Sequence, residues 1–181
     1  ILYAPTWRES IDGGKTYSIK PPIHFDKWQK ELEGEYVVLF RAHHQTTKVL
    51  GVEYNEFVRN MSDYPAVNDL LIAADILITD YSAIAFDYSI LCRPIFCYAY
   101  DYDRYLMERG TYFSIDKVYP NRSCRTEESL LQQIKEMDYI KECANTKQFR
   151  DEFVQYGIGA TKRCINKVFG EGKNENINGY K

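Results

Sequence analysis

Three kinds of sequence feature are missing from this chain of 181 residues, and each absence excludes a class of protein. The chain has no surplus of positive charge. Its formal net charge at pH 7 is -3, which argues against broad nucleic-acid binding, because neutralising phosphates takes a basic surplus. This balance is still compatible with a local basic pocket for one small anion. No apolar run is long enough to span a membrane.

Cysteine is scarce and irregularly spaced. The five cysteines are an odd number, and no two of them have the CxxC spacing of metal and redox motifs. We therefore expect free thiols in a reducing compartment, with neither a disulfide framework nor a metal cluster. Nothing in the sequence calls for a metal or another cofactor, and we expect none.

The residues that are present describe a globular chain rich in aromatic side chains. Hydrophobic residues make up 45% of the chain and charged residues 27%, and its length suffices for one domain with a sizeable core. The 16 tyrosines predict amphipathic surfaces that contact a ligand or partner. We expect one domain over residues 1–169 and a polar, disordered tail over residues 170–181. Because Ile1 already begins an apolar, strand-like run, we expect the chain to be the C-terminal half of a larger protein.

The stretch Asp75–Ala99 predicts a strand, a helix and a second strand in succession. Ile76–Ile78 is a short apolar run typical of a buried strand, and Ile95–Ala99 is another. Between them, apolar residues recur at roughly helical spacing after Ser82, which is placed to cap the first turn. Such a unit builds a parallel sheet, whose ligands bind at the carboxyl ends of its strands. Thr79–Ser82 lies at that place.

The rest of the chain alternates strands and helices, which predicts an α/β fold with a Rossmann-like parallel sheet flanked by helices. Further strands are expected at Ile1–Ala4, Tyr36–Phe40 and Phe57–Met61, and further helices at Ile23–Leu32, at Val67–Ala74, from Thr126, at Lys147–Tyr156 and at Thr161–Phe169. The stretch Tyr100–Tyr105 fits two interpretations equally well: the wall of a pocket for a base or sugar, or a tyrosine-rich surface helix.

Polar and charged side chains follow the predicted strands at their carboxyl ends. Pro5–Arg8 places a hydroxyl, an indole and a guanidinium after the first strand, which suits a phosphate or sugar ligand. The plain alternative is a turn with an arginine on the surface. Arg41 and His43 follow the strand Tyr36–Phe40 and share one side of it if the strand continues. A histidine near neutrality can donate to a phosphate or move a proton.

Four segments follow one another in an order that is typical of one family: ILYAPTWRE at the start, the Arg-x-His strand end at Arg41 and His43, ADILITDYSAIAFDYSILCRPIFCYAYD, and Gly-Ala-x-x-Arg near the end. In this order they resemble the CDP-glycerol glycerophosphotransferases, which are the teichoic-acid primases and polymerases and their capsule-polysaccharide relatives. The resemblance covers Ile1 to Phe169. It implies a GT-B-type architecture of two Rossmann-like domains, in which this chain is the C-terminal, donor-binding one and the N-terminal acceptor domain is missing.

The resemblance also implies a reaction. The family moves glycerol phosphate, or a similar polyol phosphate, from CDP-glycerol to a hydroxyl of a lipid-linked or polymer acceptor and releases CMP. The implied site residues are His43 as the catalytic residue and, for donor binding, Thr6, Arg8, Arg41, Thr79, Asp80, Tyr81 and Ser82. Ala83 departs from the family, which usually has a second serine there. We expect the general base in the missing half, so that this chain alone binds donor without turnover. The implied location is the cytoplasm, and peripheral association with the inner face of the cell membrane is compatible with a lipid-linked acceptor.

Two other functions stay open on the residues alone. The same crevice suits a GT-B glycosyltransferase that uses a UDP- or GDP-sugar. A non-catalytic nucleotide-binding or receiver-like module is the third candidate, because Asp80 after an apolar strand suits a phosphoacceptor; the acidic pair that a receiver needs after its first strand is absent. Asp80 itself has two interpretations, as a ligand contact or as a residue that fixes the turn and caps the helix.

Overall fold

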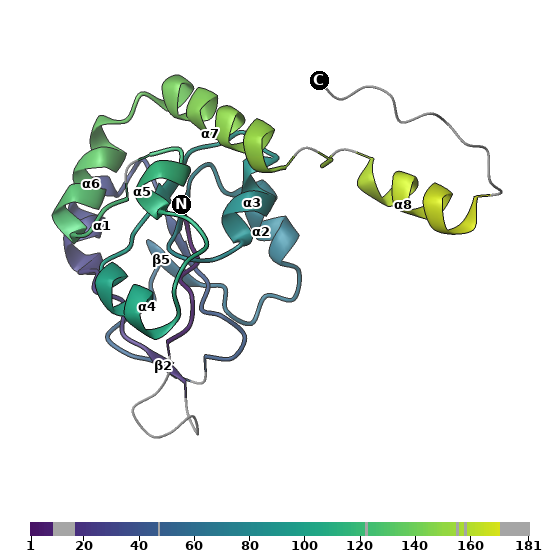
Figure 1. Cartoon of the computed structure of the whole chain (residues 1–181). Coiled ribbons are helices and arrows are strands. Elements are labelled where there is room, and N and C mark those ends of the chain that lie inside the picture. Colours follow the sequence, from purple (N-terminus) through teal and green to yellow (C-terminus); the bar gives the residue numbers. More distant parts are fainter. Residues whose placement is uncertain (9–16, 47, 122, 155, 158, 171–181) are drawn as a thin grey trace.

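Five short strands form a parallel sheet at the centre of the computed structural model, with helices on both of its faces (Figure 1). The structure describes residues 1–8, 17–46, 48–121, 123–154, 156–157 and 159–170. The strands of the sheet are β1 (Leu2–Tyr3), β3 (Val38–Phe40), β5 (Val58–Asn60), β6 (Leu77–Thr79) and β7 (Ile95–Cys97). Two further strands, β2 (Ser18–Ile19) and β4 (Lys48–Val49), form a separate parallel pair.

The order of the strands in the sheet is β5-β3-β1-β6-β7. The chain therefore moves outward from β1 through β3 to β5, and then returns to the other side of β1 at β6. Leu2 lies opposite Leu39 of β3 and Leu77 of β6 in the register. The reversal between β1 and β6 is the topological switch point of the sheet, and open α/β sheets bind ligands in the crevice outside the carboxyl ends of the strands at such a point.

Two large hydrophobic cores pack helices against the sheet, one on each face, and a third, smaller cluster holds Ile115 against Cys97 and Ala99. The helices are α1 (Phe25–Leu32), α2 (Val67–Ala73), α3 (Ile84–Ser89), α4 (Tyr102–Glu108), α5 (Ile115–Val118), α6 (Glu127–Glu136), α7 (Tyr139–Phe153) and α8 (Ala160–Phe169). Trp28 of α1 and Leu130 of α6 belong to the same core as Tyr3, whereas Tyr88 of α3 belongs to the same core as Leu2. Neighbouring residues of β1 thus point to opposite faces, and both are buried because helices cover both sides.

The predicted Rossmann-like parallel sheet is confirmed, and each strand end falls within two residues of the expected limit. The helix expected at Lys147–Tyr156 is wrong at both ends, because α7 begins at Tyr139 and ends at Phe153. The side chain of Asp138 caps α7 by accepting a hydrogen bond from the Lys141 N–H at 3.1 Å. Only Thr146 and Phe149 are buried in this helix, so no apolar stripe marks its first half in the sequence.

Of the other predictions about single segments and helix caps, some agree with the structure and some do not. Tyr100–Tyr105 lies largely in α4, a helix without a buried residue. Thr126 caps α6, because its side chain accepts a hydrogen bond from the Ser129 N–H at 3.2 Å. Ser82 is not the cap residue of α3: Ala83 holds that position, and the Ser82 hydroxyl accepts from the Ile84 N–H at 3.3 Å.

The C-terminal part of the chain separates from the sheet. Helix α8 has no buried residue and stands apart from the other helices (Figure 1). Residues 171–181, which make up nearly all of the expected tail, lie outside the described residues. Within the described ranges, none of the helices combines the length and the apolar character that crossing a bilayer requires. All five cysteines are free thiols.

Helix α3 follows the turn at the switch point, and one buried hydroxyl holds this helix in place. Tyr88 donates a hydrogen bond to the Ala74 carbonyl at 2.9 Å, and Arg93 donates to the same oxygen at 2.6 Å. We predict that Tyr88→Phe lowers the free energy of unfolding by about 1 kcal/mol, because one bond is lost while the carbonyl stays paired. Urea unfolding measures this, with the fully exposed Tyr112→Phe as the matched control. Equal stability of the two variants would contradict the anchoring role.

Candidate functional site

A cavity of about 210 Å³ lies at the switch point, and we call it the switch-point cavity. Its walls come from the ends of β1 and β3, from the turn before α3 and from the start of α2. The residues that line it are Ala4, Pro5, Arg41, Ala42, His43, His44, Val67, Ser82 and Ile84. The carboxyl ends of strands distant in the sequence thus meet here, as the strand order requires.

Arg41 is held beside this cavity by the loop that follows β5. Its Nη1 donates to the carbonyl oxygens of Met61 at 2.9 Å and Tyr64 at 2.7 Å. Within the described part of the chain, Nε and Nη2 have no hydrogen-bond partner. The guanidinium is therefore fixed in place by one nitrogen while its other donors remain available to an anion.

His43 brings a titratable ring to the same wall. Its imidazole lies 6.4 Å from the Trp7 ring and 4.1 Å from that of His44, measured between centroids. Burial, and to a smaller extent the nearby His44, lowers the pKa of His43 below its ordinary value. The ring is therefore mostly neutral near pH 7 in the absence of a ligand.

Asp80 lies directly behind the cavity and is engaged by the end of β1. Its Oδ1 accepts hydrogen bonds from the Thr6 N–H at 2.9 Å, the Thr6 hydroxyl at 2.5 Å and the Tyr81 N–H at 2.7 Å. Its Oδ2 forms an ion pair with Arg8 Nη2 at 2.9 Å. The side chain is only 2% exposed, so these bonds replace the water that a buried carboxylate loses.

Arg8 extends this network to the end of β7. Its Nε and Nη2 donate to the two carboxylate oxygens of Asp101 at 2.8 and 3.0 Å, and Nη1 donates to the Thr6 carbonyl at 2.7 Å. Tyr81 donates to Asp101 as well, at 2.9 Å. Burial disfavours the charge of Arg8, but the bonds to Asp101 and the attraction of Asp80 outweigh it and raise the pKa of Arg8 further. Asp80, Arg8 and Asp101, which we call the Asp80 network, tie together the ends of β1, β6 and β7.

The structure divides the eight residues expected at the site into three groups: those that line the switch-point cavity, those that line neither it nor the cavity described next, and Tyr81, which lines only the latter. Arg41, His43 and Ser82 line the switch-point cavity. Thr6, Arg8, Thr79 and Asp80 line neither this cavity nor the one described next. They bond to one another or to the sheet, as where the Thr79 hydroxyl donates to the Ala4 carbonyl at 2.8 Å.

Tyr81 and Ser82 line a second cavity of about 300 Å³, which we call the aromatic cavity. Its walls include the ring of Tyr105, stacked on Tyr81 with centroids 3.7 Å apart, and those of Phe86 and Phe113. Tyr105 falls in the tyrosine-rich stretch for which a pocket wall was one interpretation. Phe113 was missed, because nothing in the local sequence shows that its loop returns to the turn before α3.

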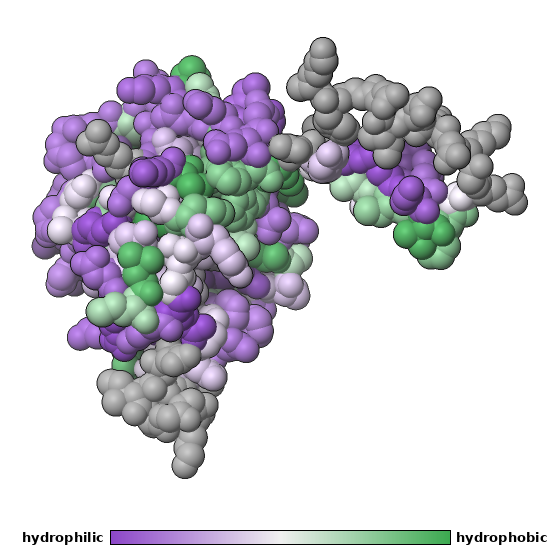
Figure 2. Space-filling model, viewed as in Figure 1, coloured by the Kyte–Doolittle hydropathy of each residue, from purple (hydrophilic) through white to green (hydrophobic). Residues whose placement is uncertain are grey.

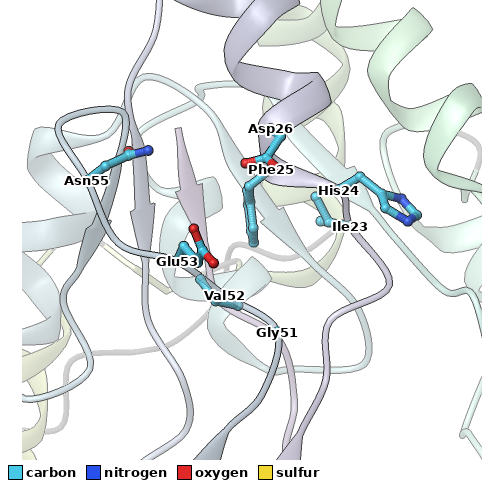
Figure 3. Close-up of a pocket in the computed structure, with 8 residues that line it drawn as sticks. All are labelled: Ile23, His24, Phe25, Asp26, Gly51, Val52, Glu53 and Asn55. Atoms are coloured by element: carbon cyan, nitrogen blue, oxygen red, sulfur yellow. The ribbon is translucent and has the colours of Figure 1, made fainter.

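A third cavity, of about 370 Å³, lies away from the switch point, between the start of α1 and residues 51–55 (Figure 3). Asp26 and Glu53 give it a negative lining, and the imidazole of His24 points away from Glu53 in this view. That imidazole pairs instead with Glu127, with 2.7 Å between Nδ1 and Oε2. A negative lining disfavours an anionic ligand, so the larger volume of this cavity does not make it the better candidate site.

Among the residues that the structure describes, no group of three or more His, Cys, Asp or Glu side chains is arranged to hold a metal ion. The side chains that line the switch-point cavity include arginine, histidine and hydroxyl donors. Such groups bind phosphate oxygens through charge-assisted hydrogen bonds.

The parallel sheet and the switch-point cavity together define a class of protein. It is a doubly wound, Rossmann-like domain with a cationic cavity at its switch point, as in one half of a GT-B-type transferase. Residues 1–170 match the family model described as CDP-Glycerol:Poly(glycerophosphate) glycerophosphotransferase. The chain belongs to this family, and the resemblance seen in the sequence is confirmed.

The chain is also similar to individual proteins whose roles are known. It is 36% identical over 167 residues to the teichoic acid glycerol-phosphate primase of Bacillus subtilis (strain 168), covering 91% of this chain and 42% of the relative. It is 36% identical over 141 residues to the teichoic acid glycerol-phosphate transferase of Staphylococcus aureus (strain NCTC 8325 / PS 47), covering 76% of this chain and 36% of the relative. A solved structure of a variant of the wall teichoic acid polymerase TagF, soaked with CDPG, matches with a TM-score of 0.75 and 32% identity, covering 92% of this chain and 42% of that one. The chain thus spans less than half the length of these relatives.

The Asp80 network generates a stability prediction. We predict that Asp80→Ala lowers the free energy of unfolding by about 3 kcal/mol, because it leaves the two Thr6 donors and the Tyr81 N–H without their acceptor and removes one of the two carboxylates that pair with Arg8. Urea unfolding measures the loss. The matched control is Asp87→Ala on the exposed side of α3, for which we expect a change within about 0.5 kcal/mol. Similar losses for the two variants would show that Asp80 is not a structural node.

Proposed function

We propose that this chain is the donor-binding part of a transferase that moves glycerol phosphate, or a similar polyol phosphate, from CDP-glycerol to a hydroxyl acceptor. One observation carries the proposal: the switch-point cavity brings Arg41, His43 and Ser82 together although their strands are far apart in the sequence. Membership of the glycerophosphotransferase family supports the choice of donor. Synthesis of teichoic acid or of a related capsular polymer is the corresponding process.

In this proposal the diphosphate of the donor occupies the switch-point cavity. Arg41 offers Nε and Nη2 to its oxygens, and the Ser82 hydroxyl donates a neutral hydrogen bond. Because His43 Nδ1 accepts from the Gln45 N–H, the Nε2–H of the neutral ring is a donor, and protonation strengthens its bond to the anion. The oxygens of Asp80 are occupied by the donors of Thr6, Tyr81 and Arg8, and Asp80 does not line the cavity, which limits its repulsion of the ligand. Thr6, Arg8, Thr79, Asp80 and Tyr81 then serve the donor by holding the turn in place.

The reaction is a displacement at phosphorus. The acceptor oxygen attacks the phosphorus that bears the glycerol and forms a new P–O bond. The bond from that phosphorus to the bridging oxygen breaks, and CMP leaves with the electron pair. Arg41 and protonated His43 stabilise the charge that develops on the leaving group, since phosphoryl transfer depends mainly on positioning and electrostatics. The hydroxyl proton passes to a base that we place in an N-terminal acceptor half, which would make the chain binding-competent but inactive alone.

Peripheral attachment to the inner face of the membrane would bring the enzyme to a lipid-linked acceptor. Helix α8 supports this part of the proposal, because it exposes Ile165, Val168 and Phe169 as a hydrophobic patch (Figure 2). The same helix carries Lys162 and Lys167 and no acidic residue. Basic helices with an apolar face bind at the surface of anionic bilayers.

Donor binding gives the first test. We predict that CDP-glycerol at about 100 times its Kd raises the Tm by about 5–10 °C, more than UDP- or GDP-sugars do. His43→Ala should weaken binding by roughly tenfold, or about 1.5 kcal/mol, through loss of a hydrogen bond to a charged group. The control is His24→Ala, which lies at the acidic cavity and should bind normally. A larger shift with a UDP-sugar would instead favour a glycosyltransferase, and no shift with any nucleotide would remove the enzyme hypothesis.

The lowered pKa of His43 generates a second test. A diphosphate favours the protonated ring, so binding raises the pKa of His43, and the complex takes up a proton. We therefore predict that affinity for CDP-glycerol increases as the pH falls from about 7.5 to about 5.5. Calorimetry in buffers of different ionisation enthalpy measures both effects. His43→Gln should flatten the pH dependence and His24→Gln should not; an unchanged slope in His43→Gln would show that another group titrates.

A further inference from the structure

The aromatic cavity differs in chemistry from the switch-point cavity beside it. None of the side chains that line it carries a charge at neutral pH, and most of the wall is ring or methyl surface. In the space-filling view, hydrophobic surface gathers over α3 and α5, where this cavity opens (Figure 2). At about 300 Å³ it is at the lower end of the range of small-molecule sites, which suits a single sugar or polyol unit.

The two cavities meet at one residue. Ser82 lines both, with Arg41 and His43 on one side of it and Tyr105 and Phe113 on the other. A phosphorus atom held at Ser82 would therefore have a cationic wall on one side and a neutral, aromatic wall on the other.

The geometry of phosphoryl transfer assigns the two sides. The attacking and leaving oxygens lie roughly in line, on opposite sides of the phosphorus. The leaving nucleotide gains negative charge, so it belongs on the side of Arg41 and His43. The attacking hydroxyl belongs to an uncharged unit, so it approaches from the opposite side.

We infer that the aromatic cavity is the part of the acceptor site that this chain contributes: it takes the terminal polyol or sugar unit whose hydroxyl attacks the donor, while the rest of the acceptor binds in the N-terminal half. The inference rests on the proposed function and extends it to the second substrate. The rings of Tyr81 and Tyr105, stacked on each other, form part of the cavity wall and present aromatic surface to the C–H groups of such a unit. The Asp80 network positions this wall, because Asp101 accepts the hydrogen bond of Tyr81.

Titration of the ¹⁵N-labelled full chain by NMR tests the inference with glycerol, N-acetylglucosamine, CDP and cytidine as separate probes. We expect the two neutral probes to shift the amide signals of Tyr105, Thr111 and Phe113. CDP should shift those of Ala42, His43 and Ser82 instead.

Variants of the aromatic cavity test whether the neutral probes bind there. Thr111→Trp places an indole in the aromatic cavity and should weaken the neutral probes by about tenfold, because the filled cavity loses its contacts. The Kd of CDP-glycerol should change by less than about twofold, since the donor site is separate. Thr161→Trp on the exposed α8 is the matched control and should change neither. Phe113→Ala, which opens the wall without filling it, is a second variant, and circular dichroism checks that each one is folded.

The outcomes separate the inference from the proposed function. If neither neutral probe shifts Tyr105, Thr111 or Phe113, or if Thr111→Trp and Phe113→Ala leave their binding unchanged, the acceptor subsite is refuted. If cytidine shifts these residues, the cavity takes the base of the donor, and the inference is again overturned. If CDP fails to shift Ala42, His43 and Ser82, the proposed function itself falls, whatever the neutral probes show.

Discussion

The buried carboxylate of Asp80 is the constraint on which the rest of the site depends. It joins the end of β6 to the end of β1 across the switch point, and four donors satisfy its oxygens in a nearly inaccessible place. Removing a partner from such a cluster costs more than the cluster contributes to stability, so its value lies in fixing one geometry. That geometry turns Ser82 outward, where it separates the two cavities.

Charge is distributed in the crevice by the same network. Arg8 is the cation nearest Asp80, and its donors are directed to Asp80, Asp101 and the Thr6 carbonyl. Arg41, in contrast, donates to backbone carbonyls through Nη1 only. Two arginines that look alike in the sequence therefore differ in their contacts: Arg8 pairs with the carboxylates of Asp80 and Asp101, whereas Arg41 lines the switch-point cavity. The result is a cationic cavity beside a neutral one, which suits a reaction between an anionic donor and an uncharged hydroxyl.

Much of the fold class could be predicted from the sequence, because buried parallel strands are short apolar runs and their alternation with helices indicates a parallel sheet. The candidate site could be placed at the strand ends, where ligands of such sheets bind, and three of the eight residues expected there line the switch-point cavity. What the sequence could not provide is the pairing of Arg8 with Asp101, 93 residues apart, or the return of Phe113 to the turn before α3. The start of α7 was missed because few of its side chains are buried.

The central claim is that the diphosphate of the donor binds in the switch-point cavity. The most direct measurement is a crystal structure of this chain soaked with CDP-glycerol. The account predicts phosphate density within hydrogen-bond distance of Arg41, His43 and Ser82, with the carboxylate of Asp80 still bonded to Thr6 and Arg8. Phosphate density elsewhere, or an Asp80 that has left Arg8 to contact the ligand, would contradict it.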